Sequence, residues 1–456
     1  MGHNDGRIGT LIHAADLHLG SPFQGVRSRF STDETGVEKV KELLSSVSQS
    51  FDNLVKITLE EQADILVLAG DIYDGAEQEY QLQEKFVEGL KKLVAGGVKV
   101  FIVHGNHDPL ITQTPEDIPL PKEVIVFKNT KEADVISVEL KSGETVEVAG
   151  MSYKTQKEDR HLAKDFFNSE VLSVKNPKTS IGILHTNLSG SNDHADYAPS
   201  KIEDLRDAPI GYWALGHVHR RQYGTLDDTN ERRWWAYPGN LQGRSTKPSE
   251  CEPKGCLVVA IHPDGFAEPD FRHCDTVRFG NVSIPLEGTL KEKISDEDAL
   301  KETLNEALAG AINTFHESRE DTKPTIFTVE LTGNTSNHVK LDSWDEEGKL
   351  LANFRDYIRE DFPDCLIMKV KAKYVPINNF EEHRGNDSFA GALFDAMENL
   401  NIEQYLSSSD FVKNGPLENN LKTLKDTIED DRDTLKQIES EVNRILLSLL
   451  ERQRNG

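Results

Sequence analysis

Short apolar runs that end at Asp, Asn or His are the feature that most restricts the fold of this sequence. Between Thr10 and about Ile261, runs rich in Val, Ile and Leu alternate with turn signals and amphipathic stretches, which predicts buried strands in an α/β layer fold. Residues 37–62 carry apolar side chains near helical spacing, so we expect a crossover helix between the first two strands. The predicted strands are residues 10–14, 65–69, 98–103, 124–127, 181–184, 212–215 and 255–261.

Five of these runs lead into short polar motifs. Open α/β sheets place their binding sites at the carboxyl ends of strands, which is where these motifs fall. A single motif of this kind is often a capped turn, but five of them in this order are very unlikely to arise by chance. The motifs are Ala15-Asp16-Leu17-His18, Gly70-Asp71-Ile72-Tyr73-Asp74, Gly105-Asn106-His107-Asp108, Leu184-His185-Thr186-Asn187 and Gly216-His217-Val218-His219.

The residue types in these motifs indicate a metal site. Carboxylate, amide and imidazole groups together match the ligands of divalent first-row metals. Alternation in Asp16-x-His18 and His217-x-His219 predicts that both side chains of each pair point to one side of an extended segment. Three glycines are expected to let the backbone approach a crowded site closely, namely Gly70, Gly105 and Gly216.

Together the motifs resemble the calcineurin-like metallophosphoesterase superfamily, and within it the nuclease branch that includes SbcD and its relatives. The resemblance implies a four-layer α/β core in which two mixed β-sheets pack face to face and are flanked by helices. It also implies two divalent metal ions, most often Mn²⁺, bridged by Asp71. One ion would bind Asp16, His18, Asp71 and His219, and the other would bind Asp71, Asn106, His185 and His217.

The same resemblance suggests catalytic residues that are not ligands. His107 would stabilise the transition state or protonate the leaving oxygen, and Asp108 would orient His107 or fix the turn. Asp74 resembles the residue at this place in bacterial nucleases, and both a catalytic and a turn-stabilising role stay open for it. Protein Ser/Thr phosphatases of the superfamily carry Arg-Gly where this chain has Gly75-Ala76, and Glu where it has Asp108, which argues against that class.

A segment after the last motif narrows the resemblance further. Residues 237–244, with the sequence YPGNLQGR, are similar to a turn in a bacterial group called YhaO-like. Six basic residues face three acidic ones between Gly216 and Pro248, which predicts a positive rim that binds phosphate, although a solvated loop is the alternative. The substrate-binding candidates in this segment are Arg220 and Arg244.

Composition sets limits on compartment and partners. The formal charge of −26 argues against nonspecific binding of nucleic acid by a basic surface. Metal ions, a basic partner protein or an organism that favours acidic surfaces would each reconcile this charge with DNA. We find neither a secretory pattern at the N-terminus nor an apolar run long enough for a membrane span, so a cytoplasmic protein without membrane contact is expected.

The remaining sequence predicts a second and a third domain after a phosphoesterase domain of residues 1–278. Residues 281–350 carry 15 acidic against 7 basic residues, and a small α/β capping domain is expected over residues 279–378. Its predicted elements are helices at 296–316 and 347–361 and strands at 325–331 and 365–373. Residues 379–456 are expected to form a linker and a C-terminal helix, whose apolar residues at 417–449 follow heptad spacing.

The heptad stripe needs a surface to cover it. Packing against its own domain and binding a helix of another chain are both open. In SbcD-type nucleases, a helical C-terminus binds the coiled-coil base of an ATPase of the structural-maintenance class. The resemblance therefore implies a DNA exo/endonuclease subunit in DNA repair, a partner ATPase of this SMC-like kind, and a possible homodimer. A small-molecule or nucleotide phosphodiesterase is the alternative, and a non-catalytic scaffold is a third.

Four further side chains have plain structural interpretations. His13 and His104 are expected to be packed core histidines, while Trp234 and Trp235 either stack on bases or pack in the core, with core packing expected for at least one.

Overall fold

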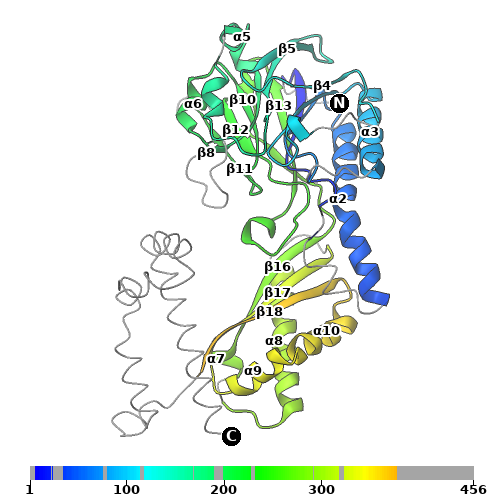
Figure 1. The fold of residues 1–456 in the computed structure, drawn as a ribbon, viewed down its shortest axis with the longest axis vertical. Helices are drawn as coiled ribbons and strands as arrows, with labels where there is room; N and C mark the ends of the chain where they lie inside the picture. Colours follow the sequence, from blue (N-terminus) through cyan, green and yellow to red (C-terminus); the bar gives the residue numbers. More distant parts are fainter. Residues whose placement is uncertain are drawn as a thin grey trace, which may run out of the picture. The chain divides into compact units, whose positions relative to one another are not determined.

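The computed structural model describes residues 6–21, 23, 34–74, 80–112, 118–167, 169–188, 199–226, 232–290, 292–317 and 323–376. The chain divides into two compact units, residues 1–280 with 323–326 and residues 281–322 with 327–456 (Figure 1). The predicted C-terminal helix and Gly75-Ala76 lie outside the described residues. None of the described helices is long and apolar enough to cross a membrane.

The first unit contains a sheet of seven strands in the order β14-β13-β1-β2-β3-β4, with β15 beside β13. Strands β1 to β4 run parallel, and β13 joins them antiparallel to β1. Each predicted run in this sheet forms a strand, with bounds that shift by one residue at most. The strands are β1 Gly9–Ala14, β2 Ile65–Ala69, β3 Lys99–Val103, β4 Val124–Val126, β13 Gly255–His262, β14 Gly265–Phe266 and β15 Asp270–His273.

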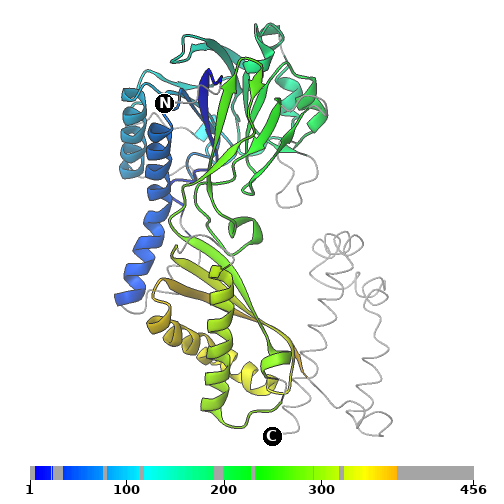
Figure 2. The same ribbon diagram turned by 180° about the vertical axis from the view of Figure 1, so that it is seen from behind.

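Two long helices, α2 (Glu34–Glu60) and α3 (Tyr80–Ala95), lie side by side in both views of the first unit (Figures 1 and 2). Helix α2 is the predicted crossover between β1 and β2. Its apolar side chains recur every three or four residues, so they gather on one face. Phe51 of this face is buried and meets Phe86 of α3 with ring centroids 5.2 Å apart.

A second sheet of six strands has the order β11-β12-β10-β7-β6-β5. Its central strands are parallel, and the two edge strands are antiparallel to their neighbours. The strands are β5 Asp134–Glu139, β6 Thr145–Met151, β7 Ile181–His185, β10 Tyr212–Gly216, β11 Gln222–Thr225 and β12 Trp234–Tyr237. Short elements accompany it, namely α4 Leu162–Asp165, α5 Ser169–Leu172, α6 Ile202–Asp207, β8 Asn187–Leu188, β9 Pro199–Ser200 and the 3₁₀ turns Leu110–Thr112, Pro177–Thr179 and Pro248–Glu250.

The two sheets pack face to face through one apolar core. Strands alternate their side chains, so every second residue of each sheet points into this layer. Phe101 of the first sheet and Tyr212 and Trp234 of the second belong to the same buried cluster. The prediction of two mixed sheets flanked by helices is therefore confirmed, and so is core packing for one of the two tryptophans.

The second unit contains a three-stranded sheet in the order β16-β17-β18. Its apolar core joins the sheet to the helices through residues such as Leu304, Phe327 and Phe354. Both predicted helices and both predicted strands form, and β16, α7 and α9 are additional. The elements are β16 Arg278–Pro285, α7 Leu286–Thr289, α8 Glu297–Glu317, β17 Thr325–Thr335, α9 His338–Glu346, α10 Lys349–Asp361 and β18 Cys365–Pro376.

Strand β17 extends beyond its apolar run, which ends at Leu331. The extension contains Gly333 with φ of +82°, a left-handed conformation that glycine adopts readily and that is typical of turns. Hydroxyl groups of Ser283 and Thr332, 3.0 Å apart, join the extension to β16. Pairing between strands that are distant in the sequence thus overrides the local signal.

The two histidines predicted to be packed in the core differ. His13 is fully buried, and its ring nitrogens lie 3.1 Å from the Tyr212 hydroxyl and 3.2 Å from the Leu215 carbonyl, so this prediction is confirmed. His104 is only partly buried, and its Nδ1 lies 3.3 Å from a carboxylate oxygen of Asp108. His104 therefore belongs to the surroundings of the polar motifs rather than to the apolar core.

Burial of His13 predicts an acid-sensitive contribution to stability. Burial lowers the pKa of His13 to about 3, so the folded protein keeps this ring neutral while the unfolded chain binds a proton below its ordinary pKa. Its stability contribution is present above about pH 6.5 and is lost at about 1.4 kcal/mol per pH unit as the pH falls below that value. We expect the melting temperature of His13→Gln to fall less between pH 7 and pH 5 than that of the unmodified protein. Parallel curves for the two proteins would contradict this.

Candidate metal centre

The motif residues lie at the carboxyl ends of parallel strands from both sheets. Strands β1, β2 and β3 are neighbours in the first sheet, and β7 and β10 are neighbours in the second. Because the two sheets face each other, their carboxyl ends meet along one edge of the unit. The structure thus brings together all seven predicted ligands, Asp16, His18, Asp71, Asn106, His185, His217 and His219.

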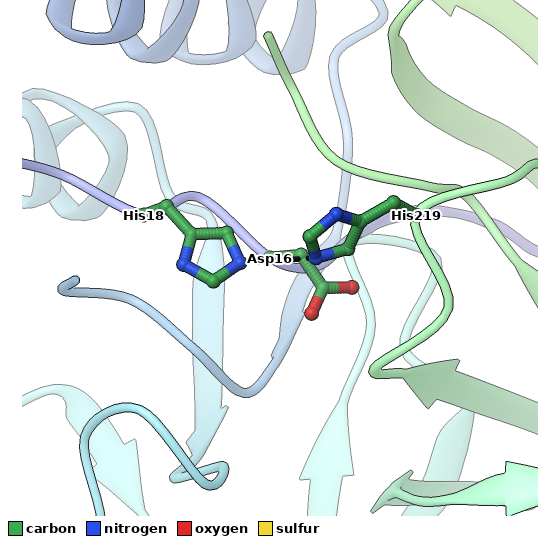
Figure 3. Close-up of side chains that lie close together, drawn as sticks. All are labelled: Asp16, His18 and His219. Carbon is green, nitrogen blue, oxygen red and sulfur yellow. Dashed lines mark hydrogen bonds between the residues drawn. The ribbon is translucent and has the colours of Figure 1, made fainter. Parts of the chain in front are cut away.

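One group consists of Asp16, His18 and His219, whose ligand atoms lie within 4.8 Å of one another. Figure 3 shows the two imidazole rings pointing toward each other from different chain segments, with the Asp16 carboxylate beside them. The Nε2 atoms of the two rings are 3.1 Å apart. All three side chains are buried. Two imidazoles and a carboxylate therefore converge on one small volume.

A second group gathers around His185. Its Nε2 lies 3.4 Å from Asp71 Oδ2 and 3.0 Å from Asn106 Oδ1. The same Asn106 oxygen lies 3.1 Å from Nδ1 of His217. Asp71 stands between the two groups, because its Oδ2 is also 3.9 Å from Nε2 of His18. Asp16 reaches the second group as well, since its ligand atom lies within 4.8 Å of those of Asp71 and His185.

Hydrogen bonds orient two of these imidazoles. Nδ1 of His185 lies 2.9 Å from the Ala69 carbonyl, and Nδ1 of His219 lies 2.7 Å from Oε1 of Glu250. A carbonyl and a carboxylate accept, so Nδ1 carries a proton in both rings and Nε2 is the nitrogen left to face a cation. Both Nε2 atoms face the centre. Burial opposes protonation of His185, but the Asp71 carboxylate raises its pKa to about 9, so a cation that binds there must displace the proton on Nε2.

The backbone is strained where the candidate ligands stand. Four of the six non-glycine residues with positive φ in the described chain are Asp16, His18, Asp71 and His217, with φ of 51°, 47°, 51° and 101°. Such conformations cost on the order of 1–3 kcal/mol each and persist where the surrounding structure imposes them. The expectation that Asp16 and His18 alternate on an extended segment is wrong, because both have left-handed φ values, although their side chains do converge.

All three predicted glycines allow the close packing of the centre. A Cβ at Gly216 would lie 1.8 Å from the Ala69 carbonyl oxygen. Gly70 has φ of +90°, and a Cβ there would lie 2.3 Å from Nδ1 of His185. A Cβ at Gly105 would lie 2.2 Å from Oδ1 of Asp71. The expected close approach of the backbone is therefore present at all three positions.

Burial and neighbouring charges shift the pKa values of the side chains in the centre in different directions. Burial raises the pKa of Asp16, and the neighbouring Asp71 carboxylate adds to this effect. Burial also opposes ionisation of Asp71, but the charge and hydrogen bond of His185 outweigh it and hold the pKa of Asp71 well below its ordinary value. Burial lowers the pKa of His18 to about 3, so this ring is neutral near pH 7. A buried carboxylate of this kind needs positive partners, which protonated histidine or a cation can supply.

His107 lies beside the centre and is held by Asp74. Its Nδ1 is 2.8 Å from Asp74 Oδ1, and this hydrogen bond raises the pKa of His107. Asp74 Oδ2 in turn accepts a hydrogen bond of 2.9 Å from Nη1 of Arg244. Asp74 also lies near His18, but the guanidinium already supplies positive charge there, so this group of side chains is a poorer candidate for a cation.

Asp108 holds the turn that carries Asn106 and His107. Its carboxylate accepts hydrogen bonds of 2.9 Å from the backbone N–H of Gly105 and 2.9 Å from that of Ile72. The carboxylate thus ties the motif after β3 to the motif after β2. Between the two roles predicted for Asp108, the contacts favour fixing the turn, whereas the ring of His107 contacts Asp74.

Glu250 is a participant that the sequence does not reveal. It is 6% exposed, and its Oε1 lies against Nδ1 of His219. It stands 31 residues after His219 in a short 3₁₀ turn, with no motif around it. The sequence signal is its place near the turn at residues 237–244, and this signal does not distinguish Glu250 from the half-buried Glu252 nearby.

The predicted positive rim is mostly engaged in internal contacts. Arg220 is exposed and pairs with Glu252 at 3.1 Å, so the structure does not bring it to the centre. The Arg221 guanidinium lies 3.9 Å from the centroid of the Phe271 ring, and Arg233 donates to backbone carbonyls, including that of Ala208 at 2.8 Å. Arg244 alone among these four contacts a candidate catalytic residue.

The donor set fits a two-metal site. Imidazole nitrogens, carboxylate oxygens and an amide oxygen are the ligands of Mn²⁺, Zn²⁺ and related ions. Two groups of buried Asp and His side chains lie next to each other, and Asp71 reaches both. The chain therefore carries clusters that can hold two divalent cations.

Gly105→Ala is expected to weaken metal binding, because the new Cβ would fall 2.2 Å from Oδ1 of Asp71 and force that carboxylate to move. We expect a loss of at least about tenfold in Mn²⁺ affinity, measured by titration calorimetry. Gly310→Ala in α8 is the control, because a Cβ there has nothing within 4 Å. Equal Mn²⁺ affinities of the Gly105 and Gly310 variants would refute the crowding argument.

Comparisons with known proteins agree with this geometry. The family model described as calcineurin-like phosphoesterase matches residues 9–221. An uncharacterized metallophosphoesterase, YhaO of Bacillus subtilis, is 28% identical over 386 residues, which cover 78% of this chain and 89% of that protein. The DNA double-strand break repair protein Mre11 of Methanocaldococcus jannaschii is 30% identical over 222 residues, covering 48% of this chain and 53% of that protein.

The SbcD component of the SbcCD nuclease of Bacillus subtilis is 26% identical over 241 residues, covering 46% of this chain and 57% of that protein. The chain thus matches little more than half the length of Mre11 and of this nuclease component. All five polar motifs fall within the range that the family model matches. The turn at residues 237–244 lies beyond that range. Through residues 9–221, this chain is similar to the calcineurin-like phosphoesterase family.

Proposed function

We propose that this chain is a DNA exo/endonuclease subunit that hydrolyses phosphodiesters with two divalent cations, Mn²⁺ in the first instance. The observation that carries the proposal is the convergence of buried carboxylate, amide and imidazole groups from five strand ends. A metal-dependent phosphoesterase is the activity that such clusters and the family support. The more specific part of the proposal is that the phosphodiester is that of DNA.

The proposed ligands divide as the geometry groups them. Asp16, His18 and His219 would hold one cation, while Asn106, His185 and His217 would hold the other. Asp71 would serve both, which its contacts with His18 and His185 support. Two cations bound there would neutralise phosphate charge and acidify the attacking water.

The proposed roles of the neighbouring residues follow from their hydrogen bonds. His107 is the general acid, since its raised pKa favours the protonated ring near neutral pH. Asp74 holds Nδ1 of His107, so Nε2 is the nitrogen that can reach a leaving oxygen. Asp108 keeps the turn in place, and Arg244 holds Asp74 and is the substrate-binding candidate that lies within reach of the centre.

DNA as substrate is supported by the names of the repair protein and the nuclease to which the chain is similar. The proposal includes an SMC-like coiled-coil ATPase as partner, bound through residues 379–456, and a possible homodimer. The three-domain division of residues 1–278, 279–378 and 379–456 is part of the same proposal.

A small-molecule or nucleotide phosphodiesterase is the second candidate, favoured by charge. The formal charge is −26, and Arg220, Arg221 and Arg233 are engaged by Glu252, Phe271 and backbone carbonyls. A small ester needs no long basic surface, whereas DNA does.

Two substitutions separate binding from chemistry. His107→Ala should keep Mn²⁺ affinity within about twofold and lower turnover by about 10²-fold or more, because a general acid is lost while the ligands stay. Asp71→Ala should lose both, because the carboxylate contacts both groups. Calorimetry with Mn²⁺ and hydrolysis of an aryl phosphodiester measure the two effects. A His107 variant unable to bind Mn²⁺ would refute the assigned role.

Linear DNA and a small aryl phosphodiester, offered to the purified protein with Mn²⁺, distinguish the two candidate functions. Cleavage of both, lost in His107→Ala, is expected for the nuclease, and unlabelled DNA should then inhibit hydrolysis of the small ester. Ester cleavage that an excess of DNA leaves unchanged would instead support the small-molecule phosphodiesterase.

A further inference from the structure

Glu250 occupies a buried position directly behind His219, where its two carboxylate oxygens have different partners. Oε1 lies 2.7 Å from Nδ1 of His219. Oε2 accepts hydrogen bonds of 2.8 Å from Nδ2 of Asn240 and 3.1 Å from the backbone N–H of Arg244. Lys254, itself buried, donates from Nζ to the backbone carbonyl of His219 at 2.6 Å. Both carboxylate oxygens therefore have partners, and the residue is almost fully buried.

The contact with Oε1 decides which nitrogen of His219 faces the centre. A carboxylate accepts hydrogen bonds and cannot donate, so Nδ1 carries the proton and Nε2 presents a lone pair. That Nε2 is the atom that lies 3.1 Å from Nε2 of His18 (Figure 3). An imidazole without such a partner is free to rotate or to take the other tautomer, and then presents N–H to a cation.

The hydrogen bond that Oε2 accepts from Arg244 acts on the other side of the centre. It fixes the backbone of Arg244, whose side chain donates from Nη1 to Asp74 at 2.9 Å. Asp74 in turn holds the ring of His107 at 2.8 Å. One carboxylate thus supports a candidate ligand through one oxygen and, through the other, the arginine that supports the candidate acid.

We propose that Glu250 is the positioning residue of this centre, which fixes the metal-binding tautomer of His219 and, through Arg244, the Asp74–His107 pair. The inference rests on the proposed two-metal function and adds to it a residue that lies outside the motifs. It assigns Glu250 no contact with substrate or with a cation.

An isosteric substitution gives a sharp test of this role. Glu250→Gln keeps the shape but has a single acceptor oxygen. If that oxygen faces His219, the amide N–H₂ opposes the donors of Asn240 and Arg244; if it faces them, the N–H₂ opposes Nδ1–H of His219. Glu250→Ala removes both contacts and serves as the second variant.

Asp64→Asn is the matched control. Asp64 is also 6% exposed, and its carboxylate accepts hydrogen bonds on both oxygens, from the backbone N–H groups of Thr10 at 2.8 Å and Lys141 at 2.7 Å. It immediately precedes β2, whereas Asp71 follows that strand, so the control removes a buried carboxylate at the opposite end of the sheet. Loss of stability alone should appear in this variant as well.

The experiment measures Mn²⁺ affinity of the full chain by calorimetry and by the electron paramagnetic resonance of free Mn²⁺, with melting temperatures recorded beside them. Glu250→Gln is expected to bind Mn²⁺ about 10- to 100-fold more weakly than the unmodified protein, while Asp64→Asn binds it normally. Arg244→Met should keep Mn²⁺ affinity and lose turnover, because it breaks only the branch to His107.

Normal Mn²⁺ affinity in both Glu250→Gln and Glu250→Ala would overturn the inference and leave the proposed function intact. Equal losses in the Glu250 variants and in Asp64→Asn would also overturn it, since they would show a general effect of destabilisation. An unmodified protein that does not bind Mn²⁺ would overturn the proposed function and this inference with it.

Discussion

Burial of several ionisable side chains at the shared edge of two sheets is the constraint on which the rest of this structure depends. Asp16, His18, Asp71 and His185 are almost inaccessible to solvent. Charged groups in such a place are costly unless they are paired and hydrogen-bonded. The chain meets this requirement by placing imidazoles against carboxylates, so the same contacts that make the centre tolerable also give it the donors that divalent cations bind.

The backbone around the centre is shaped by this requirement. Asp16 and Asp71 have left-handed φ values, and the segments that carry them are joined by hydrogen bonds from Asp16 N–H to the Gly70 carbonyl at 3.0 Å and from His18 N–H to the Asp71 carbonyl at 3.0 Å. The large apolar layer between the sheets holds both segments in place. Local strain is therefore offset by packing that lies away from the centre.

A second layer of polar contacts surrounds the candidate ligands. Asp108 ties two motifs together, Ala69 orients His185, and Glu250 orients His219. Such partners fix ring orientation and tautomer, and these properties decide whether a lone pair points at a cation. Arg244 also belongs to this layer through its contact with Asp74, while Arg220 pairs with Glu252.

The sequence by itself determined the crossover helix, the strands that lead into the polar motifs and, through the resemblance that these motifs carry, the seven candidate ligands. Apolar periodicity and motifs at strand ends are local properties of the chain. It could not identify Glu250, since a lone glutamate 31 residues from His219 carries no local signal. Nor could the sequence show that Arg220 pairs with Glu252 at the surface while Arg244 pairs with Asp74 at the centre. Only the tertiary structure decided these pairings, because they depend on which strand ends meet when the two sheets pack face to face.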